Sequence, residues 1–124
     1  MISASNFALA GSALGVAVTA ALALVFIRDP VKGMVQTTHH QDQLPQVMTG
    51  RYVALAALAL GATLYADMTV IAFLFAVFAF LGFADAAIYW RAGRPFLKHL
   101  IAGSTALAVM AMAIVALYQT GAPI

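Results

Sequence analysis

Residues 68–90 read MTVIAFLFAVFAFLGFADAAIYW, an apolar run rich in phenylalanine whose single charged side chain is Asp85. About 20 consecutive apolar residues cross the hydrocarbon core of a bilayer as an α-helix. This run is long enough, and the chain around it is equally apolar, because hydrophobic residues make up 65% of the 124 residues and charged residues only 8%. The stretch therefore predicts a membrane-spanning helix and indicates that the chain is an integral membrane protein.

The composition excludes several classes of protein. An average soluble domain has roughly 25% charged residues, whereas this chain has six Lys or Arg and four Asp or Glu in total. So few charges cannot cover a soluble surface, which excludes an ordinary soluble enzyme, a disordered tail and a nucleic-acid-binding module. The chain has no cysteine, which excludes disulfide scaffolds, zinc–thiolate sites, iron–sulfur clusters and thiol nucleophiles.

Three more segments are apolar enough to span a membrane, at residues 7–27, 48–66 and 96–118. With 68–90 they make four expected transmembrane helices. The uncharged core 52–66 covers only roughly 22 Å as a helix, so we expect its helix to begin earlier, just after Pro45. The chain is predicted to be a single all-α domain over residues 1–124, an up-down-up-down bundle of four transmembrane helices.

The basic residues predict the orientation of these helices. All six fall on the side that holds the loop 28–47 and the short connection after the third helix, and an excess of Lys and Arg marks cytoplasmic loops. We therefore predict a multi-pass protein of the bacterial inner membrane with both termini in the periplasm. Tyr89 and Trp90 are typical of an interfacial anchor at the cytoplasmic end of the third helix. The basic residues are Arg28, Lys32, Arg51, Arg91, Arg94 and Lys98.

Two of the four aspartates lie at informative positions. Asp67 stands where the second and third helices meet with almost no connection, and we interpret it as the N-cap of the third helix. Asp85 lies five residues before Trp90, or roughly 7–8 Å inside the membrane. A carboxylate at that depth is costly unless it has a partner. The topology brings Arg51 and His99 to the same face, which predicts a polar cluster of Arg51, Asp85 and His99.

This polar cluster admits three interpretations. It can bind a head group or a small anion, or it can relay protons, because histidine titrates near neutral pH and burial raises the pKa of an aspartate toward it. It can equally be a structural Asp–Arg pair that sets the register of the helices. We find no nucleophile, oxyanion hole or second catalytic carboxylate, so we predict no catalytic residue and no enzyme.

The histidines also raise the question of metals and cofactors. His39 and His40 lie near Asp42 in the long loop, but adjacent histidines do not share a helix face, so we expect a solvated loop and no metal site. His99 is a possible ligand of haem iron or chlorophyll magnesium, although its place beside Lys98 favours an interfacial histidine. No cofactor is predicted.

Small residues at a spacing of four recur in the first two helices. Such positions let helix backbones approach closely in a membrane, so we expect them to pack within the chain or against a partner. The positions are Gly11 and Gly15 in the first helix and Ala57 and Gly61 in the second.

Short motifs in the last three helices form a pattern. They are Gly50-Arg51, Gly82-x-x-Asp85-Ala86 and Lys98-His99 followed by Gly103. Over roughly residues 50–117 the chain resembles a family of small bacterial four-helix integral membrane proteins of unknown function. Members often carry an acid after the arginine, where this chain has Tyr52. The resemblance implies the four-helix fold and the grouping of Arg51, Asp85 and His99, and it implies no activity.

Three functions fit these features. The first is a non-catalytic accessory subunit that packs against a larger inner-membrane complex, since the chain is small, has minimal loops and offers no catalytic set. The second is a binding or transport protein for a small or lipophilic ligand, with Arg51, Asp85 and His99 as its specificity point. The third is a membrane enzyme that acts on a lipid or quinone. The expected partners are the lipid bilayer and other membrane subunits or a second copy, and no nucleic acid.

Overall fold

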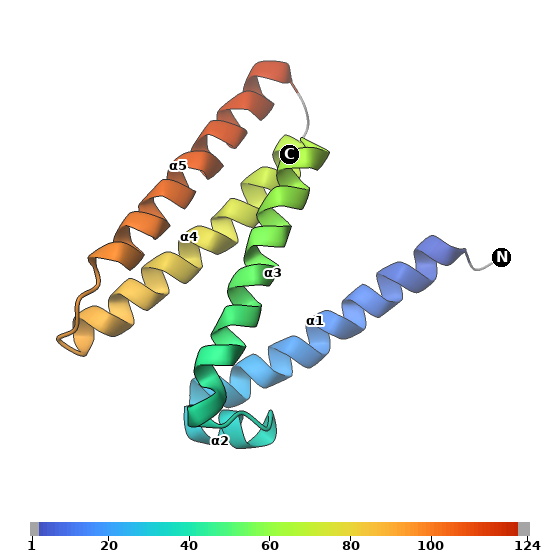
Figure 1. The fold of residues 1–124 in the computed structure, drawn as a ribbon. Coiled ribbons are helices and arrows are strands. Elements are labelled where there is room, and N and C mark those ends of the chain that lie inside the picture. The colour runs from blue at the N-terminus through green and yellow to red at the C-terminus, as the bar shows by residue number, and fades with distance from the viewer. Residues whose placement is uncertain (1–2, 122–124) are drawn as a thin grey trace. The chain divides into compact units, whose positions relative to one another are not determined.

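A computed structural model describes residues 3–121, which form helices and no strand (Figure 1). The helices are α1 (Ala4–Arg28), α2 (Pro30–Gln36), the 3-10 helix η1 (Gln41–Gln43), α3 (Leu44–Tyr65), α4 (Met68–Arg91) and α5 (Leu97–Thr120). Of these, α1, α3, α4 and α5 are long and apolar enough to cross a membrane. The predicted all-α fold with four spans is confirmed, and a helical bundle fits this content.

Among the starts of the four long helices, that of α3 differs most from the prediction. The helix was expected from about residue 48 and begins at Leu44. The reason is Pro45, which stands in the first turn. A backbone N–H there has no acceptor within the helix, so the N–H that proline lacks is not needed. The helix therefore includes the proline that was expected to precede it, and it gains the length that the uncharged core 52–66 lacks.

The connection between α3 and α4 consists of Ala66 and Asp67 alone. Ala66 has a left-handed backbone with a φ of 57°, which ends α3. The backbone N–H groups of Thr69 and Val70 donate to Oδ1 of Asp67 at 2.8 and 3.1 Å. Asp67 is thus the N-cap of α4, as predicted, and one short turn reverses the chain.

The segment that was expected to be a loop contains the short helix α2. Asp29 caps this helix by accepting a hydrogen bond from the backbone N–H of Lys32 at 3.1 Å, and Pro30 occupies its first position, where proline is favoured. Gly33 faces α1, because a Cβ at Gly33 would lie only 2.6 Å from the ring of Phe26. The helix therefore folds back against the end of α1.

The chain divides into two units, Met1–Arg51 and Tyr52–Ile124, which are described separately. In the first unit α2 packs against α1, and α1 buries none of its residues. In the second unit α4 and α5 run side by side as an antiparallel hairpin (Figure 1).

The interface between α4 and α5 is built mainly from small residues. The buried positions are Ala79, Gly82 and Ala86 of α4 and Gly103, Ala106, Ala113 and Leu117 of α5. Small side chains let two helix backbones come close without a gap. The hairpin therefore has a fixed register, which determines the side chains that face one another near its turn.

Candidate functional site

The polar site of the second unit lies near the closed end of the α4–α5 hairpin. Oδ2 of Asp85 on α4 and Nδ1 of His99 on α5 are 3.7 Å apart. That separation is too long for a hydrogen bond, so the two groups form an ion pair when the imidazole is protonated. Their side chains are 43% and 31% exposed, respectively. The pair is therefore accessible from outside the hairpin.

Tyr89 is a third member of this site. Its ring stacks on the ring of His99, with centroids 4.8 Å apart and planes inclined by 15°. Tyr89 follows Asp85 by four residues, a spacing that puts both side chains on one face of α4. The imidazole therefore stacks on the ring of Tyr89 and faces the carboxylate of Asp85. The sequence analysis assigned Tyr89 only as an interfacial anchor and missed this contact.

A contact between two glycines brings the helices together beside the pair. A Cβ at Gly82 would lie 2.5 and 2.6 Å from the backbone N and Cα of Gly103, and 3.1 Å from the backbone oxygen of His99. Any side chain at Gly82 would therefore push α5 away and separate His99 from Asp85. Gly82 and Gly103 appeared in the sequence pattern, but not as a contact. Their equal distance along the chain from the turn at Ala92 and Gly93 is the signal that could have predicted it.

Two of the three residues in the predicted polar cluster are therefore brought together. Asp85 and His99 both belong to the second unit, whereas Arg51 is an exposed residue at the end of the first unit. The two units are described separately, so the part of Arg51 in the cluster stays a prediction.

His39, one of the two loop histidines, makes local contacts. Nδ1 of His39 lies 2.6 Å from the hydroxyl of Thr37, and the backbone N–H of His39 donates to the backbone oxygen of Met34 at 2.8 Å. Within residues 3–121, no group of three or more His, Cys, Asp or Glu side chains is placed to hold a metal ion. His39 therefore helps to close the end of α2.

The small residues predicted to pack lie on open faces of their helices. A Cβ at Gly11, Gly15 or Gly61 would meet no atom within 4 Å, and Ala57 is exposed. Their packing stays a prediction, and any helix that covers them has room to approach closely.

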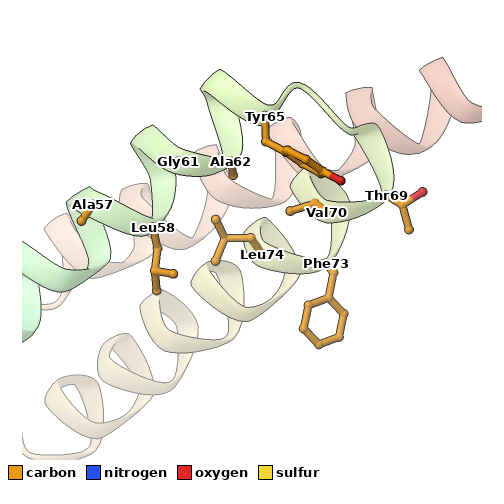
Figure 2. Close-up of a pocket in the computed structure, with 9 residues that line it drawn as sticks. All are labelled: Ala57, Leu58, Gly61, Ala62, Tyr65, Thr69, Val70, Phe73 and Leu74. Atoms are coloured by element: carbon orange, nitrogen blue, oxygen red, sulfur yellow. The ribbon is translucent and has the colours of Figure 1, made fainter. Parts of the chain in front are cut away.

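An apolar groove of about 780 Å³ runs between α3 and α4 within the second unit (Figure 2). It is lined by Ala57, Leu58, Gly61, Ala62, Tyr65, Thr69, Val70, Phe73 and Leu74. The side chains of Leu58 and Leu74 point into the space between the helices, and the hydroxyls of Tyr65 and Thr69 lie at the end nearest the turn (Figure 2). Two of the predicted packing positions therefore belong to one concave surface.

No known protein family, curated protein or solved structure matches the chain. Its function is therefore inferred from its own residues. The observations available for this are the Asp85–His99 pair with Tyr89, the groove between α3 and α4, and the charges at the ends of the helices.

Proposed function

We propose that the chain is a non-catalytic accessory subunit that packs against a larger membrane complex. The observation that carries this proposal is the groove between α3 and α4, which is apolar over almost its whole lining. Small residues on one wall, Ala57 and Gly61, leave room for a second helix backbone, and close backbone approach drives helix association where lipid provides no hydrophobic effect.

The α4–α5 hairpin supports this interpretation of the groove. At Gly82, α4 and α5 come so close that a single Cβ would collide with the backbone of Gly103 on the neighbouring helix. Gly61 has the same chemistry but open space above it. The chain thus uses glycine for close helix packing at one interface, and the groove presents a similar surface to a partner.

A matched pair of substitutions tests the proposal. Ala57 lines the groove, whereas its neighbour Ala56 is exposed and lies outside the groove. Ala57→Leu fills the groove, and Ala56→Leu adds the same side chain beside it. Each variant is extracted gently from the native membrane and isolated, and co-purifying proteins are identified by mass spectrometry. We expect wild type and Ala56→Leu to carry a stoichiometric complex and Ala57→Leu to lose it.

Two outcomes would contradict the proposal. The wild-type chain emerging alone, or only with copies of itself, would exclude an accessory role. Equal retention of the complex by Ala57→Leu and Ala56→Leu would show that the groove is not the contact surface. The fold of each variant is checked by circular dichroism, so that a lost partner is not confused with a lost fold.

We place the protein in the inner membrane of a bacterium, with both termini in the periplasm. The basic residues support this orientation: five of the six lie in or next to the connection between α1 and α3 or the connection between α4 and α5, and Arg51 lies in the half of α3 nearer to the first of these connections. In a chain of four spans, these two connections emerge on the same side of the membrane. Positive charge is retained on the cytoplasmic side.

A second candidate function is the binding of a small or lipophilic ligand at Asp85 and His99. The observation that favours it is the exposure of the pair, since a carboxylate within a membrane helix with one loosely placed partner has unused hydrogen-bonding capacity. Tyr89 orients the imidazole toward that same partner. Such a site offers polar groups at the edge of an apolar hairpin.

A double-mutant cycle distinguishes ligand binding from a structural pair. Asp85→Asn, His99→Gln and the double variant are compared for stability in detergent and for small molecules that co-purify. Binding predicts that Asp85→Asn stays folded and loses a molecule that wild type carries. If both single variants unfold easily and the double variant recovers, the pair is structural and this candidate function is excluded.

A further inference from the structure

The turn between α4 and α5 carries a cluster of exposed cations. Arg91 ends α4, Arg94 lies in the turn, and Lys98 stands in the first turn of α5. Within residues 3–121, none of the three has a carboxylate oxygen within 4 Å or a side-chain hydrogen bond. These three residues, named here the basic turn, are therefore free to bind an anion.

The backbone of the basic turn is short and fixed. The N–H of Ala92 donates to the oxygen of Ile88 at 3.1 Å, and the N–H of Arg94 donates to the oxygen of Tyr89 at 2.9 Å. Gly93 has a φ of 66°, the left-handed conformation with which helices commonly end. Because the backbone is already ordered, a ligand that binds the three cations orders only their side chains.

The charge around the basic turn is unbalanced. Residues 86–98 contain no acid, and the nearest one, Asp85, already faces His99 at 3.7 Å. The other three basic residues on the same side of the predicted topology share their segment with Asp29 and Asp42. The basic turn thus has the higher local positive charge. The other three basic residues are Arg28, Lys32 and Arg51.

Exposed aromatic and apolar side chains flank the basic turn. Trp90 is 64% exposed and Leu97 is 62% exposed, and tryptophan is typical of the membrane–water interface. With Trp90 at the interface, its neighbour Arg91 lies at the level of the lipid phosphates. The position and the charge point to the same ligand.

We propose that the basic turn binds the phosphate group of an anionic phospholipid. Arginine and lysine form charge-assisted hydrogen bonds with phosphate oxygens, and basic residues just outside a transmembrane helix attract anionic lipids. The phosphate is held by Arg91, Arg94 and Lys98, and the acyl chains lie along the apolar surface of the α4–α5 hairpin. This site is separate from the groove between α3 and α4.

The single tryptophan of the chain provides a local probe of this site. Trp90 is the only tryptophan, and it is adjacent to Arg91. The full chain is reconstituted in vesicles of phosphatidylcholine that contain phosphatidylglycerol with brominated acyl chains, which quench tryptophan fluorescence. The experiment is repeated with brominated phosphatidylcholine. The ratio of quenching by brominated phosphatidylglycerol to quenching by brominated phosphatidylcholine measures the preference of the site for the anionic lipid. We expect a preference of roughly fivefold for each cation that contacts the phosphate.

Two triple variants with the same change in charge test the assignment. Arg91→Gln, Arg94→Gln and Lys98→Gln together should reduce the preference to about one. Arg28→Gln, Lys32→Gln and Arg51→Gln together should leave it unchanged, because they lie outside the basic turn. Arg91→Lys with Arg94→Lys keeps the charge and should retain most of the preference.

Two results would overturn the proposal. An equal fall in both triple variants would mean that the lipid responds to net charge alone. No preference for the anionic lipid in wild type would mean that the basic turn does not select an anionic phospholipid. A reporter fused to the C-terminus confirms that each variant keeps the orientation of wild type, so that quenching is compared at the same membrane surface.

Discussion

At the scale of single residues, what faces a glycine decides its role in this chain. A Cβ at Gly82 would meet the backbone of Gly103 at 2.5 Å, whereas a Cβ at Gly61 would meet nothing within 4 Å. A backbone cannot move aside as the end of a side chain can. Gly82 is therefore required by its neighbour, and Gly61 is not required by any atom of the described chain.

We expect Gly82→Ala and Gly61→Ala to have opposite effects on stability. Gly82→Ala forces α4 and α5 apart and should lower the free energy of unfolding by about 1–3 kcal/mol, as overpacking does. Gly61→Ala should raise it by up to about 1 kcal/mol, because alanine is the better helix former. Unfolding of the purified chain by titration with SDS, followed by circular dichroism, measures both. A neutral Gly82→Ala would contradict the close contact.

Asp67 offers a second test at the residue scale. It accepts two backbone hydrogen bonds at the start of α4, and loss of such a cap costs about 1 kcal/mol. Asp67→Ala should therefore destabilise the chain by about that amount in the same titration, while Asp67→Asn should cost much less, because asparagine caps nearly as well. Equal losses in the two variants would indicate that the charge matters and the cap does not.

The candidate site was only partly predictable from the sequence. Asp67 and Asp85 stand out because a charge in an apolar run needs a physical reason. His99 follows from the topology. Tyr89 and the contact of Gly82 with Gly103 were missed, because they depend on the register between two helices, and a motif search within one helix cannot see that register.

At the scale of elements, the two turns of the second unit use left-handed residues differently. Ala66 ends α3 with a φ of 57°, and Gly93 follows α4 with a φ of 66°. Glycine adopts this conformation without steric cost, whereas a residue with a Cβ is strained in it. One turn therefore carries strain that the other avoids.

Exchanging the residue types at the two turns should shift stability in opposite directions. Ala66→Gly relieves the strain and should raise the free energy of unfolding by about 1 kcal/mol, while Gly93→Ala introduces it and should lower that free energy by about 1 kcal/mol. The two variants are compared in the SDS titration. Changes of the same sign would mean that the turns do not have these conformations.

The helices themselves were the most predictable elements, because a long apolar run leaves few alternatives. The third span was expected at 68–90 and is Met68–Arg91. The short helix α2 was missed, since its seven residues carry no periodic pattern. Its signal was the Asp29-Pro30 pair, a cap followed by a favoured first residue.

At the scale of the whole molecule, the distribution of charged residues predicts the orientation of the chain in the membrane. Five of the six cations lie at the connections α1–α3 and α4–α5 or next to them, and Arg51 lies in the half of α3 nearer to the first connection, while the α3–α4 turn carries only the acid Asp67. A membrane protein keeps its basic residues in the cytoplasm. The α3–α4 turn and both termini should therefore lie on the opposite side.

Reporter fusions check this orientation. Alkaline phosphatase fused to the C-terminus should be active, because the enzyme works only in the periplasm, and the same enzyme inserted after Thr38 should be inactive. A fluorescent protein that folds only in the cytoplasm should give the reverse pattern. Activity of alkaline phosphatase inserted after Thr38 would show that this segment lies in the periplasm, which contradicts the predicted topology.

The two-residue connection between α3 and α4 has a consequence for biogenesis. Of the four apolar helices α3 is the least hydrophobic, and it carries Arg51 within its length. Only Ala66 and Asp67 separate α3 from α4. This connection is too short for one helix to span the bilayer while the other remains outside it. We therefore expect the two helices to enter the bilayer as one hairpin, in which the strongly apolar α4 offsets the lower hydropathy of α3. The carboxylate of Asp67, at the tip, is the one charge that this hairpin has to carry across.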